Sequence, residues 1–182
     1  MKKVISWLAA LVLAMGLGLI VPGSANAAAP YCGITWGSGP KYSKTYTGDV
    51  ITNVRAGRHA CFDRLVVDLR GKRAAGYNVQ YVAAVHEDGS GKEVPLRGAA
   101  DLRVIVHAPA YKDGKATYLP KNRNEVVDVS GYRTFRQVAW AGSFEGQTTI
   151  GLGVRARLPY RVFVLDGPGD RTRVVVDVAH RW

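Results

Sequence analysis

The sequence has none of the short motifs that usually mark an enzyme or a metal protein. Its histidines lack the close spacing of H-E-x-x-H and C-x-x-C metal motifs and stand alone at His59, His86, His107 and His180. No segment matches the phosphate-binding pattern G-x-x-x-x-G-K-[ST], and the turn around Ser143 lacks the G-x-S-x-G spacing of a hydrolase nucleophile. A glycosidase needs two carboxylates beside the bond it cleaves, and Glu145 has no evident second one. We therefore expect no catalytic residue, no metal and no cofactor.

Acidic residues are scarce as well. The 182 residues contain 14 Asp and Glu against 25 Lys and Arg, which gives a formal net charge of +11. A charge of this size favours an anionic surface or polymer as partner, although it also serves solubility alone.

The N-terminus has the three regions of a secretory signal peptide. Lys2 and Lys3 precede an apolar run over 4–21, and a small Ala-Asn-Ala site follows at 25–27. We predict cleavage after Ala27; removing 27 of the 182 residues leaves 155 and lowers the net charge to +9. That length suits one domain. Export argues against a nucleic-acid partner, leaves no membrane anchor and places the product outside the cell or at its wall.

Only two cysteines are present, Cys32 and Cys61. Exported proteins meet an oxidising environment in which such a pair forms a disulfide, so we predict one disulfide between them. It would tie an N-terminal arm over 28–46 to a domain over 47–182. The arm is rich in Gly, Pro, Ser and Tyr, which predicts irregular structure.

Two segments near opposite ends of the domain repeat one strand pattern. The segment 64–69 reads Arg-Leu-Val-Val-Asp-Leu, and 173–178 reads Arg-Val-Val-Val-Asp-Val. Alternate side chains of a strand face opposite sides, so the second, fourth and sixth residues form a core face in each segment. Antiparallel pairing with Val66 opposite Val175 then creates two cross-strand pairs of opposite charge, namely Arg64 with Asp177 and Arg173 with Asp68.

Alternation and turn residues predict further strands at 49–55, 77–82, 102–107, 125–129, 148–154 and 160–165. About eight strands with frequent turns and at most one short helix predict an all-β fold, either an antiparallel sandwich or a barrel. The helix is predicted over 132–139, where apolar residues fit one helical face.

Two of these strands carry finer predictions. In the strand over 49–55, Val50, Thr52 and Val54 should share the buried face. In the strand over 148–154, Gly151 and Gly153 indicate a bulge or the close approach of another segment.

The longest stretch without periodicity covers 108–124, and a loop of that length is usually functional or disordered. It mixes cations with aromatic rings, a combination that stacks on sugar rings or holds anionic groups. The predicted contact residues are Tyr111, Lys112, Tyr118, Lys121 and Arg123, with Arg155 and Arg157 as secondary candidates. A solvated loop without a ligand is the alternative.

Six short motifs are distinctive: Trp36-Gly37-Ser38, Val54 to His59 with Asp63-Arg64, Gly142 to Thr148, Gly153 to Arg155, Leu158 to Val162, and Asp177 to His180. Together they resemble the AMIN-like domain proteins of actinobacteria over nearly the whole mature chain. The resemblance implies a compact β-sandwich related to AMIN domains, which accompany cell-wall amidases and secretins and target them to the envelope, in some cases by binding peptidoglycan. Unlike the amidases, this chain is expected to lack a catalytic domain, because it ends at Trp182.

We therefore expect a secreted, non-enzymatic, monomeric module that binds the cell envelope through peptidoglycan or an attached anionic polymer. An exported protein that binds or regulates a cell-wall enzyme is the alternative, which an exposed apolar or aromatic patch would favour. A hydrolase is a third hypothesis. It requires a pocket that holds four groups within hydrogen-bond reach, namely His59, Asp63, Asp177 and His180.

Overall fold

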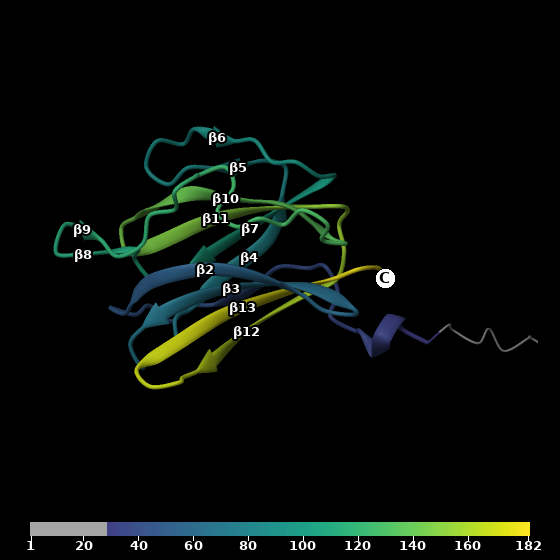
Figure 1. The fold of residues 1–182 in the computed structure, drawn as a ribbon, viewed down its shortest axis with the longest axis horizontal. Helices are drawn as coiled ribbons and strands as arrows, with labels where there is room; N and C mark the ends of the chain where they lie inside the picture. Colours follow the sequence, from purple (N-terminus) through teal and green to yellow (C-terminus); the bar gives the residue numbers. More distant parts are fainter. Residues whose placement is uncertain (1–28) are drawn as a thin grey trace, which may run out of the picture.

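The computed structural model describes residues 29–182, in which two antiparallel sheets stack face to face (Figure 1). The five-stranded sheet has the order β1 (Lys41–Ser43), β4 (Tyr77–Val82), β7 (Ala100–Val106), β11 (Gln147–Val154) and β10 (Phe135–Phe144). The four-stranded sheet has the order β12 (Tyr160–Asp166), β13 (Arg171–Ala179), β3 (Phe62–Arg70) and β2 (Val50–Arg58). The predicted all-β sandwich is confirmed. The predicted signal peptide lies outside the described residues.

Small elements cover only one of the two outer faces. The ribbon of β5 (Val85–His86) and β6 (Glu93–Val94) lies over the five-stranded sheet (Figure 1), where Val85 and Val94 pack on Ala139 and Ala141. The hairpin of β8 (Tyr111–Lys112) and β9 (Lys115–Ala116) projects from one end, and a 3-10 turn, η1 (Tyr31–Gly33), lies near the other. The outer face of the four-stranded sheet has no comparable layer within residues 29–182.

The repeated strand pattern builds the centre of the core. The predicted inward residues of β3 and β13 are all fully buried: Leu65, Val67, Leu69, Val174, Val176 and Val178. Each such side chain contributes about 1.5–3 kcal/mol when it leaves water. The same positions face the buried side chains of β7 and β11 across the sandwich.

The predicted pairing of β3 with β13 is also confirmed, since Val66 lies opposite Val175 in an antiparallel register. Arg64 and Asp177 form an ion pair with 2.6 Å between Nε and Oδ1. The second predicted charge pair occupies neighbouring positions but forms no ion pair. Arg55 on β2 instead donates hydrogen bonds to both carboxylate oxygens of Asp68. Arg173 donates to the carbonyl oxygens of Asp166 and Gly167.

The helix predicted over 132–139 is wrong, because most of this segment starts strand β10. Both faces of β10 are covered: Phe135 and Val138 point into the core, and Ala139 packs under the β5–β6 ribbon. A strand buried on both faces shows no polar alternation, and a bulge between Phe135 and Gln137 shifts the apolar positions further. Together these effects imitate a helical period.

Two other strand predictions need correction. The segment 125–129 forms no strand; it runs beside β10 and joins it through one backbone hydrogen bond, from Val126 N to Val138 O at 2.8 Å. In β2, Val50 and Val54 are buried as predicted, but Thr52 is only half-buried and Ile51 is fully buried. A bulge between Ile51 and Asn53 inserts one residue and changes which side chains face the core.

The predicted disulfide between Cys32 and Cys61 is present. It fastens the N-terminal arm, which is irregular except for η1 and the short strand β1 that pairs with β4. The close approach predicted at the β11 glycines is present as well. A Cβ at Gly153 would lie 2.0 Å from the carbonyl oxygen of Arg97, so only glycine fits there.

Candidate functional site

The lysines of the predicted contact loop are exposed. Lys112 lies in the β8–β9 hairpin and Lys121 in the segment that follows, and neither forms an ion pair among the described residues. Tyr111 is held at the hairpin base, where its hydroxyl accepts a hydrogen bond from the Gly146 N–H at 3.1 Å. The hairpin therefore offers exposed positive charge with one anchored ring.

The other two loop residues have partners within the fold. The ring of Tyr118 meets the ring of Trp140 edge-on at 5.4 Å, and burial raises the pKa of the Tyr118 hydroxyl. Arg123 pairs with Glu87, with 2.8 Å between Nη2 and Oε1. A hydrogen bond from Ser90 and then the charge of Arg123 lower the pKa of Glu87. Tyr118 and Arg123 thus help to hold the 110–124 segment against the sheet.

The secondary candidates lie at the opposite end of the sandwich. Arg155 follows β11 and donates to the carbonyl oxygen of His180, and Arg157 lies 5.2 Å over the ring of Tyr81. The hairpin contacts the other end of β11, next to Gly146. A strand of this length spans about 25 Å. The seven predicted residues therefore form two separate regions.

Arg157 also lines a hollow of about 670 Å³. Tyr81 lies on its wall, but the Tyr81 hydroxyl is already used, since it donates to Leu158 O and accepts from Leu158 N. Asp101 is the acidic residue of this hollow. Its burial, and to a smaller extent the negative charge of Glu93, raise the pKa of the Asp101 carboxyl.

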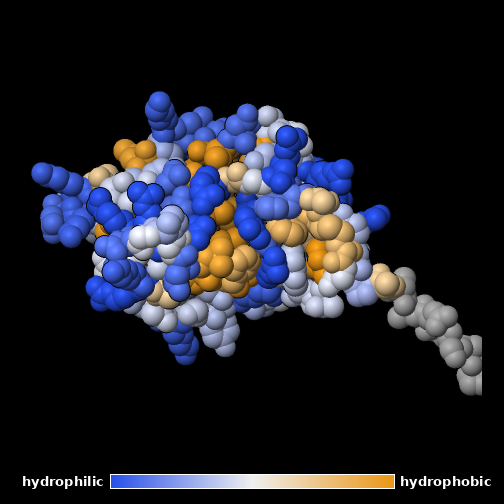
Figure 2. Space-filling model, turned by 60° about the horizontal axis from the view of Figure 1, so that its bottom comes forward, coloured by the Kyte–Doolittle hydropathy of each residue, from blue (hydrophilic) through white to orange (hydrophobic). Residues whose placement is uncertain are grey.

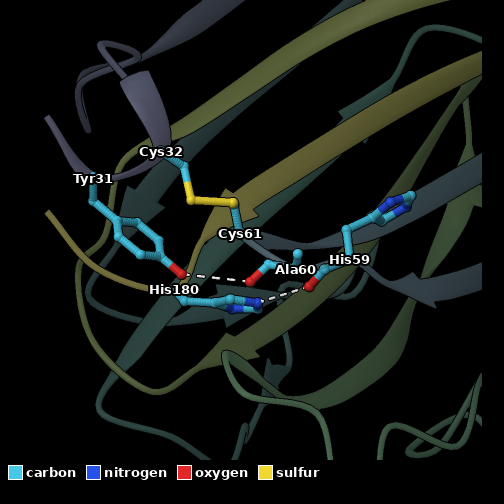
Figure 3. The surroundings of a disulfide bond; sticks show 6 residues. All are labelled: Tyr31, Cys32, His59, Ala60, Cys61 and His180. Carbon is cyan, nitrogen blue, oxygen red and sulfur yellow. Dashed lines mark hydrogen bonds between the residues drawn. A yellow bond between two sulfur atoms is a disulfide. The ribbon is translucent and has the colours of Figure 1, made fainter.

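The disulfide end of the sandwich gathers His59, Asp63 and His180 of the hydrolase hypothesis. Figure 3 shows the two histidines. His180 extends beneath the disulfide, and its Nε2 lies 3.0 Å from the carbonyl oxygen of His59. Its Nδ1 lies 3.1 Å from the Thr134 hydroxyl. Both ring nitrogens are thus engaged, which leaves none for a substrate proton.

The carboxylates of that hypothesis are engaged too. Asp63 Oδ2 accepts hydrogen bonds from the N–H groups of Thr134 and Phe135, at 2.6 and 3.1 Å. Asp177 points to the other side of the sheet, where Arg64 and Arg161 bind its two oxygens. These groups connect strands and turns, and the four are not arranged as an acid–base pair.

The uncovered face of the four-stranded sheet carries a layer of arginines on aromatic rings. The Arg161 guanidinium lies 4.5 Å from the ring centre of Trp36 and 5.0 Å from that of Phe163. Arg64 lies 5.2 Å from the ring of Phe62. Asp177 holds both guanidiniums, and its hydrogen bond raises the pKa of Arg64.

Apolar side chains continue this layer along the sheet. Figure 2, in which the underside of the sandwich is turned forward, shows an apolar patch with hydrophilic residues on both sides. Val66 and Val175 lie on this outer face, yet are almost fully buried under neighbouring side chains, and Leu165 is 37% exposed. We call the set of Trp36, Phe62, Arg64, Arg161, Phe163 and Leu165 the arginine–aromatic face.

The arginine–aromatic face was missed among the predicted site residues, although part of its signal is local. Alternation in the strand predicted over 160–165 puts Arg161, Phe163 and Leu165 on one side. Phe62 and Arg64 share a side in the same way. Trp36 reaches the sheet from the arm, and no local pattern indicates that contact.

Within residues 29–182, no group of three or more metal-binding side chains is positioned to hold a metal ion. No helix in that range is long and apolar enough to cross a membrane.

Two stacked antiparallel sheets and an arm fastened by a disulfide define a β-sandwich domain. The AMIN-like domain family matches residues 49–180, so the chain belongs to this family. No curated protein and no solved structure matches the chain. AMIN-like domains are generally non-catalytic binding modules, and membership indicates a cell-wall-related, envelope-associated or secreted protein.

Proposed function

We propose that this protein is a secreted, non-enzymatic, monomeric module that binds a cell-wall polymer, either peptidoglycan or an anionic polymer attached to it. The observation that carries the proposal is the arginine–aromatic face. Its guanidiniums lie over the rings of Trp36, Phe62 and Phe163, and the buried Asp177 holds them in place.

Such a surface suits a polymer of sugars and acidic groups. Planar guanidiniums stack on flat groups and bind carboxylate or phosphate through paired hydrogen bonds. Because Asp177 and the rings fix their positions, little side-chain entropy is lost when a ligand binds. The exposed lysines of the 108–124 loop add long-range attraction from a second region.

The test is sedimentation of the purified protein with isolated cell walls, before and after the anionic polymers are stripped, across a salt series. Binding that survives stripping and salt identifies peptidoglycan as the ligand. Binding lost with either treatment identifies charge-driven attachment. Absence of binding under every condition contradicts the proposal.

A matched pair of variants tests whether wall binding depends on the arginine–aromatic face or on net charge alone. Arg161→Ala removes a stacked guanidinium, while Arg64 still holds Asp177. Arg97→Ala removes the same charge from an exposed ion pair with Glu125, beside β10 in the other sheet. We expect only Arg161→Ala to weaken wall binding, by about tenfold for one charge-assisted contact. Equal losses in both variants would show that the face has no special role.

The second candidate function, binding of an exported protein, is favoured by the apolar patch of the same face (Figure 2). Aromatic residues and arginine are the types that dominate protein interfaces. If walls do not bind, cross-linking of the exported protein in its own culture should trap a partner through a photoreactive residue at Leu165, and not through one at Tyr42 on the edge strand β1. Equal trapping at both positions would contradict this function.

A further inference from the structure

The two large sheets have four edges, and three of them are protected. At β10, a loop segment bonds along the edge, with the Trp140 N–H donating to Arg123 O at 2.6 Å. At β2, the Ile51 N–H donates to Pro109 O at 2.8 Å, and a bulge interrupts the strand. The third edge, β1, is a strand of three residues. Short, bulged or covered edges are the usual devices that keep a sheet from pairing with other chains.

The fourth edge, β12, has none of these devices (Figure 1). Its seven residues pair with β13 without a register shift and include no proline, glycine or lysine. The side chains that point between the sheets, Val162 and Val164, are apolar and half-buried. Within residues 29–182, β12 is therefore the long, regular and uncovered edge of the sandwich.

Part of the β12 backbone is free to pair with another strand. Backbone groups of a strand alternate between its two sides. The Tyr160 N–H donates to Gly37 O at 2.9 Å, and Val162 O accepts from the Tyr77 hydroxyl at 3.4 Å, so the even-numbered residues of β12 turn away from β13. Within residues 29–182, the N–H of Val162 and both backbone groups of Val164 have no partner on that side. One extended chain can complete these bonds.

The side chains at this edge indicate what kind of segment fits. Arg161 and Arg64 share the carboxylate of Asp177, so one positive charge remains unbalanced. Arg161 binds Asp177 through Nε, and its two terminal nitrogens have no acceptor within residues 29–182. Phe163 and Leu165 continue the same side of the strand. A segment with an acidic residue opposite Arg161 and apolar residues further along therefore matches this edge in charge and polarity.

We propose that the open edge of β12 binds an extended segment of a partner protein as an additional antiparallel strand. The segment carries a carboxylate opposite Arg161 and apolar side chains opposite 162–164. Main-chain hydrogen bonds to Val162 and Val164 supply affinity, and the side-chain pairs supply specificity. The inference deepens the second candidate function and rests on it, because it names the strand that an exported protein contacts and the bonds that hold it.

The chain itself supplies a probe for this edge. Strand β13 already pairs antiparallel with β12, and it places Asp177 opposite Arg161 and valines opposite 162–164. A capped synthetic copy of 171–179 presents the same side chains to the open edge. Titrated into ¹⁵N-labelled protein, the copy should give saturable shifts at the Val162 and Val164 amides. It should slow their hydrogen exchange about tenfold once free peptide reaches about ten times Kd. Absence of saturation, or shifts centred elsewhere, overturns the proposal.

Methylated copies test the hydrogen bonds without any change to the protein. In this register the copy's counterparts of Val174 and Val176 turn their amides toward β12, and that of Val175 turns its amide away. N-methylation at the counterpart of Val174 removes a bond to Val164 and should weaken binding by at least about tenfold. N-methylation at the counterpart of Val175 should change it by less than about threefold. Equal weakening by the two copies would overturn the assignment.

Variants of the protein test the same contacts. Val164→Pro removes the outward N–H, while the bonds to β13 come from its neighbours and are kept. It should abolish saturation by the copy and the trapping of a partner through a photoreactive residue at Leu165. If this variant does not fold, the methylated copies decide the question. Arg161→Gln should weaken the copy severalfold, whereas Arg97→Gln, with the same charge change beside the other sheet, should not. Equal effects of these two variants contradict the charge pairing.

Other occupants and other failures give distinct results. Shifts at the Val162 and Val164 amides that grow with protein concentration in the absence of peptide would identify a second copy of this chain as the occupant and overturn the proposal. A protein that sediments with walls but does not saturate with the copy has the wall function without this strand site. A protein that saturates with the copy but does not sediment has the strand site, and the wall function is then wrong.

Discussion

Loss of the disulfide should destabilise the protein mainly through its unfolded state. Cys32 and Cys61 are 29 positions apart, and closing a loop of that length removes chain entropy worth roughly 3.6 kcal/mol at 25 °C. In the folded state the arm has other attachments. Tyr160 N donates to Gly37 O at 2.9 Å, and the Tyr160 hydroxyl donates to Gly39 O at 2.7 Å. We therefore expect the reduced protein to fold with its arm still docked.

The assay is urea unfolding of the oxidised protein, the reduced protein and the double variant Cys32→Ser/Cys61→Ser. The two open forms should agree, each less stable than the oxidised form by about 3–4 kcal/mol, and their m-values should be larger because the open unfolded chain exposes more surface. Hydrogen exchange should show that β1 amides stay protected after reduction. A stability loss below about 1 kcal/mol, or loss of β1 protection in the folded reduced protein, would refute the reasoning.

Three further predictions concern separate parts of the molecule. Gly153→Ala should cost about 3 kcal/mol in urea unfolding because its Cβ would collide with the Arg97 carbonyl, whereas Gly39→Ala, which meets open space, should change stability by less than about 0.5 kcal/mol. Burial lowers the pKa of His107 below its usual value near 6.5, so the folded state binds fewer protons at this residue than the unfolded state does. The free energy of unfolding should therefore fall as the pH drops from about 6.5 through the folded pKa. His107→Gln should flatten that part of a stability–pH curve. Joint alanine substitution of the loop cations should reduce wall sedimentation severalfold at low salt, and unchanged sedimentation would remove the loop from the contact surface; the substituted residues are Lys112, Lys121 and Arg123.

The sequence predicted those elements that have one buried face and one polar face. In β3 and β13 the alternation determines which side chains face the core. The outward charges determine the register, because a shift by one residue would turn Arg64 and Asp177 into the core between the sheets. The disulfide followed from the cysteine count and the predicted compartment. The helix prediction over 132–139 failed for the complementary reason. Most of that segment belongs to β10, and a strand covered on both faces loses its alternation of polar and apolar residues.

The candidate sites were harder to predict because their residues meet only after folding. The cluster of His59, Asp63 and His180 at the disulfide end joins the turn after β2 with a turn some 70 positions later, and neither turn has an unusual composition by itself. Composition did mark the loop over 108–124. It did not show that Arg123 is paired with Glu87, or that β11 separates this loop from Arg155.

The difference between the two outer faces supports placing the wall contact on the four-stranded sheet. The β5–β6 ribbon covers the five-stranded sheet, and its Val85 and Val94 complete a second small core with Ala139 and Ala141. On the other sheet, the two central valines are shielded by surrounding long side chains, and its arginines are held by Asp177 and aromatic rings. A ligand can stack on guanidiniums fixed in this way without breaking the ion pairs, so binding need not disturb the fold. The matched comparison of Arg161→Ala with Arg97→Ala measures this advantage, because the two variants change net charge equally and alter opposite sheets.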